Sequence, residues 1–381
     1  MAPINLPRRR FMQLIAGAAV LPALPSPAAE NAEASPSERG EMSNLARAFT
    51  EKYAMPGLSV AVGRGGAILY EEAFGWADRE TREPVSATHL FRIASVTKPI
   101  TSVTLFSLIE EDRIRLTDKI FGPGAITGTD YGRPPYHPGV DEITVEHLLT
   151  HTGGGWANDA ADPMFRNLEL NQAQLIESTL RNRPLDQPPG RHYAYSNFGY
   201  CVLGRVIEKI TRQSYASHVR DSVLKRCGIT EMTIAGNTLA ERHPREVKYY
   251  DSRNEREPYA MDVARMDSHG GWLARPSDLV QFLMHVSGFA TPPNILAPQS
   301  LHAMTSASAA NANYAKGWAV NKFDNWWHTG SLPGTSTIAV RTHGGFCWAA
   351  FGNSRRLNSP LDRDLDDLIW EMVRRVKSWA V

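Results

Sequence analysis

The sequence predicts an α/β protein in which both ends of the chain contribute to one sheet and a helical region lies between them. Two strand-like runs, 58–64 and 67–74, lie near the N-terminus. Helical patterns separated by proline and glycine loops fill residues 113–285, and strand-like runs return from Gly317 before a final helix. Residues far apart in sequence are therefore expected to meet at a crevice between the sheet and the helical region.

Residues 1–40 differ from the rest of the chain, and residues 41–381 are predicted to form a single domain. Arginines within residues 8–12 precede an apolar run that reaches about Leu24. Proline interrupts this run, which is shorter than the ~20 apolar residues that span a bilayer. The pattern is typical of a twin-arginine signal peptide cleaved between residues 28 and 34, with a flexible leader up to residue 40. It predicts a periplasmic or secreted protein; a disordered basic N-terminus is the alternative.

The N-terminal part of the domain is predicted to begin with a helix at 44–52 and a hairpin that turns at Arg64-Gly65-Gly66. Residues 95–111 have the apolar spacing of a helix with one buried side. That side carries Ile100, Val103, Leu105, Phe106 and Ile109.

The rest of the domain adds a periodic helix over 202–210 and four further strand-like runs, at 317–320, 325–330, 335–341 and 346–351. The final helix is predicted to begin at Ser359-Pro360. Serine is a favoured N-cap, proline suits the first helical position, and acidic residues early with basic residues late match the helix dipole.

Composition limits the classes of function. The chain has 381 residues, 42% of them hydrophobic, and 41 Lys and Arg against 40 Asp and Glu, a net charge of +1. Such a chain can bury a large core, and it has no basic patch for nucleic acid. The expected partner is a small-molecule or peptide substrate, and the oligomeric state is open.

The cysteines and histidines give no clear metal or disulfide pattern, and no cofactor is predicted. Cys201, Cys227 and Cys347 are an odd set, which argues against a disulfide framework, although two of them could still pair. Cys201 lies in an apolar helical stretch and is expected in the core. His147 and His151 have the i, i+4 spacing of metal ligands, but a polar helix edge is the simpler interpretation.

Ser95-Val96-Thr97-Lys98 is a Ser-x-x-Lys motif at the start of a predicted helix. Positions i and i+3 share a helix face, so the lysine ammonium can reach the serine hydroxyl. A serine hydroxyl needs a neighbouring base to become a good nucleophile, and a lysine serves only if burial or another cation lowers its pKa. Backbone N–H groups and the dipole at a helix start favour a developing oxyanion. Ser95 and Lys98 are therefore the candidate catalytic pair.

A second Ser-x-x-Lys motif, Ser222 to Lys225, precedes Cys227-Gly228. Because glycine commonly ends a helix, Ser222 is expected in a last turn, where the helix dipole has the wrong sign for an oxyanion. We predict a structural role for Ser222.

Tyr195-Ser196-Asn197 is the only Tyr-x-Asn in the chain. A tyrosine phenol, with a reference pKa near 10, acts as a base at neutral pH only beside a cation such as Lys98. The amide of Asn197 can hold a substrate carbonyl or the lysine. Tyr195 is the third candidate catalytic residue, and the choice between Lys98 and Tyr195 as general base is open.

His328-Thr329-Gly330 follows a predicted strand and precedes Ser331 in a tight loop. The glycine is expected to let a substrate approach the backbone closely. A rival copy, 151–153, follows a helical patch and has the pattern of a helix end. The substrate-binding role is therefore assigned to the later copy, with Ser331.

The order Ser-x-x-Lys, Tyr-x-Asn and His-Thr-Gly resembles that of the penicillin-recognising serine hydrolases. This family includes class C β-lactamases, D-alanyl-D-alanine carboxypeptidases, D-aminopeptidases and related esterases. The phrases 90–95, 143–152 and 270–273 strengthen the likeness, which covers about residues 42–378. The resemblance implies an α/β sandwich with an antiparallel sheet flanked by helices, and an active site between the sheet and an all-helical region. It also implies an acyl-enzyme on Ser95 and an oxyanion hole formed by the backbone N–H groups of Ser95 and Ser331.

One departure from the family pattern bears on the substrate. β-Lactamases usually have a lysine where this chain has His328. Histidine is mostly neutral above pH 7 and is a weaker anchor for a substrate carboxylate. The sequence therefore favours a hydrolase of esters or D-amino-acid amides and peptides, with a β-lactamase as the alternative. A catalytically silent binding protein is a third reading, which the intact motifs disfavour.

Overall fold

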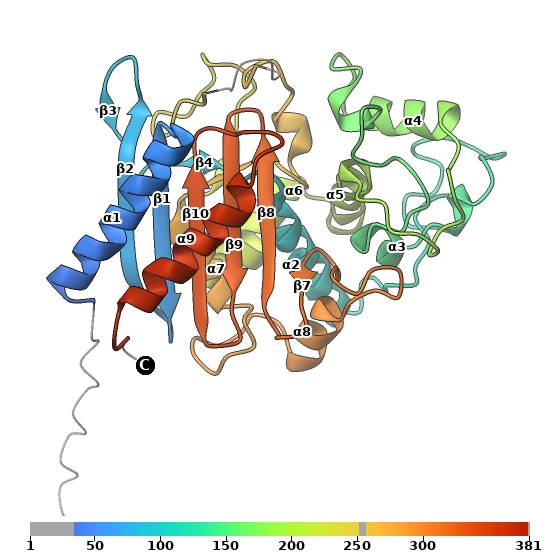
Figure 1. Ribbon diagram of the computed structural model, residues 1–381. Coiled ribbons are helices and arrows are strands. Elements are labelled where there is room, and N and C mark those ends of the chain that lie inside the picture. The colour runs from blue at the N-terminus through green and yellow to red at the C-terminus, as the bar shows by residue number, and fades with distance from the viewer. Residues whose placement is uncertain (1–33, 251–256, 380–381) are drawn as a thin grey trace, which may run out of the picture.

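The computed structural model describes residues 34–250 and 257–379. Its centre is a seven-stranded sheet in the order β3-β2-β1-β10-β9-β8-β7, with every neighbouring pair antiparallel (Figure 1). The strands are β1 (Gly57–Arg64), β2 (Ala67–Asp78), β3 (Glu83–Pro84), β7 (Ala319–Val320), β8 (Trp326–Leu332), β9 (Thr335–Arg341) and β10 (Phe346–Gly352).

Both ends of the chain meet in this sheet, as predicted. Strand β1 pairs along its length with β10, from Leu58 opposite Gly352 to Arg64 opposite Phe346. The hairpin between β1 and β2 turns at Gly65 and Gly66, whose φ angles of 58° and 87° suit glycine. The C-terminal strands follow one another as a meander, so the predicted α/β class with an antiparallel sheet is confirmed.

Two helices cover one face of the sheet (Figure 1): α1 (Pro36–Tyr53) and α9 (Leu361–Arg375). The side chains of β1 alternate between the two faces, as a strand requires. Val60 and Val62 belong to the core beneath α1 and α9, whereas Ala61 belongs to the core on the opposite face.

The opposite face packs against α7 (Pro276–Met284), which contacts β1, β9 and β10. The predicted helical insertion, 113–285, is therefore too long at its C-terminal end, because α7 belongs to the sheet layer. The insertion also contains two short strands, β5 (Thr233–Ile234) and β6 (Trp272–Ala274), which form a small antiparallel sheet with β4 (Phe91–Arg92).

The helical region lies beside the sheet, beyond β8 and β7 (Figure 1). Its α-helices are α3 (Val145–Leu149), α4 (Gln172–Asn182), α5 (Asn197–Thr211) and α6 (Tyr215–Val219). Helix α2 (Thr97–Glu110) contacts α5, α6 and α8 (Pro298–Thr305) and is buried almost all round. The turn that precedes α2, residues 94–96, contacts β8 and β9, so the N-terminus of α2 lies at the junction of the sheet and the helical region.

Two predicted boundaries differ from the structure. Helix α1 begins at Pro36 rather than Asn44, because Ser35 and Glu38 form a capping box around a proline at the first turn. Residues 36–40 are thus helical and not part of a flexible leader. The final helix begins at Leu361, one residue later than predicted, and the Leu361 N–H donates to Ser359 Oγ at 3.3 Å.

The predicted signal peptide lies outside the described residues. Within them, no helix is long and apolar enough to cross a membrane. Cys201, Cys227 and Cys347 are all buried and free, so no pair among them forms a disulfide. Cys201 lies in the core, as expected.

Candidate active site

Ser95 lies on a 3₁₀ turn, Ala94–Val96, that runs directly into α2. The helix was predicted to begin at Ser95, but in the structure α2 begins two residues later, at Thr97. Ala94 has a φ of 48°, a left-handed value that is uncommon for a residue with a side chain. Such strain is typical of a functional turn that its surroundings hold in place. Ser95 is half-buried and lines a pocket of about 380 Å³.

Lys98 is fully buried, and its Nζ contacts three oxygens. These are Ser95 Oγ at 3.1 Å, Asn197 Oδ1 at 2.8 Å and the backbone carbonyl of His269 at 3.2 Å. Burial holds the pKa of Lys98 well below its usual value. A neutral amine has two N–H donors and one lone pair. Since the amide and carbonyl oxygens can only accept, they take the two donors and the lone pair faces the Ser95 hydroxyl.

Asp162 orients this arrangement, although no sequence motif marks it. Its Oδ2 accepts a hydrogen bond from Asn197 Nδ2 at 2.8 Å, which turns Asn197 Oδ1 toward Lys98. Its Oδ1 accepts the N–H of Met164 at 2.9 Å. Burial raises the pKa of Asp162, while these hydrogen bonds oppose that rise. The capping position of Asp162 before Pro163 was the only sequence signal available.

Tyr195 lies beside the same lysine, with its ring centroid 4.7 Å from Lys98 Nζ. Burial raises the pKa of Tyr195 above its ordinary value, and a hydrogen bond with Ser95 lowers it by less. The phenol therefore keeps its proton near neutral pH, whereas the pKa of Lys98 moves in the direction that makes an amine a base.

His328 is buried and cannot present a cation to a ligand at neutral pH. Its Nδ1 is 2.6 Å from the carbonyl oxygen of Thr329, and its Nε2 is 3.1 Å from the hydroxyl of Tyr314. Burial is the main cause that lowers the pKa of His328 to about 3. Both ring nitrogens of His328 have hydrogen-bond partners within the protein. The sequence predicted a weak anchor for a substrate carboxylate at this position, but in the structure His328 offers no free nitrogen to bind one.

Gly330 permits a close approach between strand β8 and neighbouring parts of the protein. A Cβ at this position would lie 2.2 Å from the carbonyl oxygen of Ile93 and 2.2 Å from Thr337 Oγ1. The absence of a side chain lets β8 pack directly against the turn that carries Ser95. The sequence predicted that Gly330 is needed for a substrate to approach the backbone. In the structure, contacts with Ile93 and Thr337 are what require a glycine there.

The remaining predicted residues of β8, Thr329 and Ser331, lie two positions apart and therefore share the less buried face of the strand. Thr329 is half-buried, and the exposed Ser331 lines the same pocket as Ser95 and Asn197. The structure thus brings Ser95, Asn197 and Ser331 around one cavity, with Lys98 directly behind Ser95.

Arg355 was missed by the sequence analysis. It follows β10, lines the pocket, and donates a hydrogen bond from Nη1 to Ser331 Oγ at 3.4 Å. Among the described residues that line this pocket, Arg355 is the only charged side chain. No motif surrounds it, because its proximity to Ser95 arises only from the pairing of β10 within the sheet.

The earlier His-Thr-Gly copy, residues 151–153, also lies at the site through its histidine, which its helix-end pattern did not predict. His151 follows α3 with a φ of 57°, so the predicted helix end is correct. Its buried ring lies 4.2 Å from the ring of Tyr195, centroid to centroid. His147, its partner in the hypothetical metal pair, accepts the N–H of Thr144 at Nδ1 over 3.2 Å.

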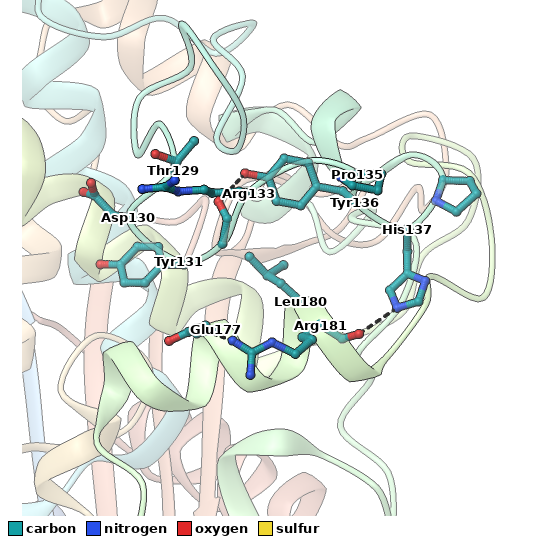
Figure 2. Close-up of a pocket in the computed structure, with 12 residues that line it drawn as sticks. Thr129, Asp130, Tyr131, Arg133, Pro135, Tyr136, His137, Glu177, Leu180 and Arg181 are labelled. Carbon is teal, nitrogen blue, oxygen red and sulfur yellow. Dashed lines mark hydrogen bonds and ion pairs between the residues drawn. The ribbon is translucent and has the colours of Figure 1, made fainter.

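A second, larger pocket of about 590 Å³ lies in the helical region (Figure 2). It is formed by the loop 129–138 and by α4, with Tyr131, Tyr136 and Leu180 on its walls. None of the predicted site residues lines it. The chemistry of the Ser-x-x-Lys motif is therefore confined to the smaller pocket.

Comparison with known proteins places these features in context. The family model described as Beta-lactamase matches residues 42–369. Penicillin-binding protein 4* of Bacillus subtilis is 26% identical over 337 residues, which cover 80% of this chain and 69% of that protein. Protein flp of Staphylococcus aureus is 24% identical over 76% of this chain, and the match spans only 58% of the staphylococcal protein.

Solved structures show the same fold. The D-amino acid amidase of Ochrobactrum anthropi SV3, complexed with L-phenylalanine amide, superposes with a TM-score of 0.73 at 20% identity, over 90% of this chain and 99% of that one. The octameric penicillin-binding protein homologue of Pyrococcus abyssi gives a TM-score of 0.71 at 20% identity, over 90% and 79% of the two chains.

Proposed function

The chain belongs to the beta-lactamase family of serine hydrolases, and we propose that Ser95 is its nucleophile and Lys98 the base that activates it. One observation carries the proposal. Lys98 Nζ lies 3.1 Å from Ser95 Oγ, while its other two contacts are oxygens that can only accept. A buried, neutral amine held in this way can take the hydroxyl proton during attack.

The proposed reaction has two halves. Ser95 Oγ bonds to the acyl carbon as its proton moves to Lys98, and the carbonyl oxygen becomes an oxyanion. The backbone N–H groups of Ser95 and Ser331 are its proposed donors, supported by the N-terminus of α2. The bond to the leaving group then breaks, and that group receives the proton from Lys98, with the Tyr195 hydroxyl assisting the transfer.

Water completes the cycle. It attacks the acyl ester on Ser95, gives one proton through Lys98 to Ser95 Oγ, and releases a carboxylic acid. Asn197 holds Lys98 in position through both halves, and Asp162 fixes Asn197.

Amides or short peptides of D-amino acids, or esters, are the proposed substrates. The fold likeness to a D-amino acid amidase supports the first class, and the absence of a cation on β8 at neutral pH supports neutral acyl donors. A pocket of about 380 Å³ suits a small acyl group. β-Lactam hydrolysis is the second candidate, and the guanidinium of Arg355 in the pocket is the observation that favours it.

A labelled penicillin or an organophosphonate tests the nucleophile. The expected result is one labelled peptide that contains Ser95. Labelling at another serine contradicts the assignment of the nucleophile, and no labelling by either probe would favour a silent binding protein. A panel of p-nitrophenyl esters, D-amino-acid amides, D-alanyl-D-alanine peptides and nitrocefin then ranks the substrate classes.

We also propose that residues 1–40 include an export signal and that the mature enzyme acts in the periplasm or outside the cell. The basic cluster at 8–12 and the apolar run after it support this proposal. Replacing Arg8 and Arg9 by Lys should keep the precursor inside the cell. Mass analysis that finds Met1 on periplasmic protein would refute it.

A further inference from the structure

Tyr314 lies between the two His-Thr-Gly histidines. Its hydroxyl is 3.1 Å from His151 Nε2 and 3.1 Å from His328 Nε2. The backbone N–H of Ser196 continues the chain at one end, 3.1 Å from His151 Nδ1, and the carbonyl of Thr329 continues it at the other, 2.6 Å from His328 Nδ1. We call these five groups the histidine relay.

The two ends of the histidine relay determine which nitrogen of each imidazole carries the proton. A backbone N–H can only donate, so His151 Nδ1 accepts and His151 Nε2 carries the proton. A backbone carbonyl can only accept, so His328 Nδ1 carries the proton and His328 Nε2 accepts. The Tyr314 hydroxyl therefore accepts from His151 and donates to His328. The two histidines are neutral and have opposite tautomers.

The histidine relay connects the two parts of the molecule that form the Ser95 pocket. Ser196 lies between Tyr195 and Asn197 in the chain, so its bond to His151 fixes the backbone that carries both side chains. The ring of His151 also packs against the ring of Tyr195 at 4.2 Å. At the other end, His328 and Thr329 belong to β8, the strand that presents Ser331 to the pocket.

Burial strengthens this connection. His151 is 1% exposed, and Tyr314 and His328 are each 5% exposed. Little water can reach these groups, so a lost bond would leave a buried polar group unpaired. Among the described residues, the titratable groups that face His328 are Lys98, Tyr195, Tyr314 and His151, and His151 also faces Tyr193 and Tyr200. A proton added to His151 would face the backbone N–H of Ser196, and a proton added to His328 would face the hydroxyl proton of Tyr314. Protonation of either ring would therefore break a hydrogen bond of the histidine relay.

We propose that Tyr314 is a positioning residue of this active site: its hydroxyl fixes the position of the Tyr195–Asn197 segment relative to strand β8 across the pocket. The proposal rests on the proposed function, because this relative position matters only if Ser95, Tyr195 and Ser331 act on one substrate. Tyr314 touches no reacting atom; it acts through His151 and His328.

Tyr314→Phe removes one oxygen and tests the proposal. Tyr193→Phe is the matched control, since the Tyr193 ring packs against both Tyr314 and His151 but its hydroxyl has no hydrogen bond among the described residues. We expect Tyr314→Phe to lower kcat for a p-nitrophenyl ester about 10- to 100-fold, with a smaller change in KM, because misplaced catalytic groups cost rates of this order. Tyr193→Phe should stay within about twofold.

A second measurement does not depend on activity. In ¹⁵N NMR spectra of the wild-type protein at neutral pH, His151 should be protonated on Nε2 and His328 on Nδ1. Tyr314→Phe should disturb the His328 signals, and Tyr193→Phe should not. Equal tautomers in the wild type, or equal kinetics of the two variants, would overturn the proposal. If the wild type shows opposite tautomers but no labelling of Ser95, the relay stands and the proposed function fails.

Discussion

The two Ser-x-x-Lys segments of this chain have the same spacing and opposite surroundings. Ser95 lies before the first turn of α2, and its lysine is buried against three oxygens. Ser222 lies within a π-helical turn, Arg220–Leu224, and donates its hydroxyl proton to the carbonyl of His218 at 2.7 Å. Its lysine, Lys225, is exposed.

The difference shows that the Ser-x-x-Lys spacing only places the serine and the lysine near each other. Their reactivity depends on burial and on the neighbouring groups. Burial lowers the pKa of Lys98, whereas the side chain of Lys225 is exposed to solvent. The start of α2 also places positive dipole ends near Ser95, while Ser222 precedes a helix end at Gly228, which has a φ of 73°. The predicted structural role of Ser222 agrees with its hydrogen bond.

The most severe way to break this comparison is to remove each serine hydroxyl. Ser95→Ala should abolish covalent labelling and lower turnover by about 10⁴-fold or more, as expected when a nucleophile is lost. Ser222→Ala should leave kcat/KM within about twofold. Rates and labelled-peptide maps for both variants are the measurements, and a comparable loss in Ser222→Ala would contradict the contrast.

The two lysines provide the next test. Lys98→Met should lower kcat by about 10³-fold, because a nucleophile and its activating base act as a unit. Lys225→Met should have little effect. The lowered pKa of Lys98 also fixes the sign of the pH dependence: the neutral amine is the active form, so kcat/KM falls on the acidic side and is level at higher pH. A rate that rises steeply through pH 9–10, as an exposed lysine would give, would refute the assignment.

Two glycines test whether β8 positions the Ser95 turn. Gly330→Ala places a methyl group against Ile93 and Thr337, and overpacking of this kind costs roughly 1–3 kcal/mol. We expect a lower Tm and a labelling rate reduced at least about tenfold, since the turn must move. Gly344→Ala is the control, because no atom lies within 4 Å of its added Cβ. Equal labelling rates in the two variants would show that the turn is held by other contacts.

Much of the fold was predictable because its signals are local. Alternating and 3.6-residue periodicities predicted the β1–β2 hairpin, strands β8 to β10 and helices α2 and α9 to within a few residues, and the order of elements predicted a sheet built from both ends. The start of α1 was missed, although the capping box of Ser35 and Glu38 is itself a local signal. The placement of α7 on the sheet could not be predicted, because an amphipathic helix does not specify which surface covers its apolar side.

The site was predictable only where a motif spans a few residues. Ser95, Lys98 and Asn197 were predicted, and the structure brings them together. Asp162 and Arg355 were not, because each reaches the site through tertiary packing and has no neighbouring pattern. His151 was set aside as a helix end, which is correct locally, yet its side chain packs against Tyr195.

The smallest expected effect concerns substrate charge. Arg355 is half-buried and lines the Ser95 pocket, whereas its neighbour Arg356 is exposed and does not line it. A charge-assisted hydrogen bond to a substrate carboxylate is worth roughly 1.5–3 kcal/mol, and solvent in an open pocket reduces it. Arg355→Gln should therefore lower kcat/KM for nitrocefin, which carries a carboxylate, about three- to tenfold.

The same variant should leave p-nitrophenyl acetate almost unchanged, because that ester has no counter-charge for the guanidinium. Arg356→Gln should affect neither substrate, since its side chain lies outside the pocket lining. The measurement is kcat/KM for both substrates in the three proteins, at one pH near 7.5. Equal losses for nitrocefin and the ester in Arg355→Gln would mean that Arg355 acts by holding Ser331 in place, to which it donates a hydrogen bond at 3.4 Å. A selective loss would instead assign to Arg355 the carboxylate recognition that His328, neutral and bonded at both nitrogens, does not provide.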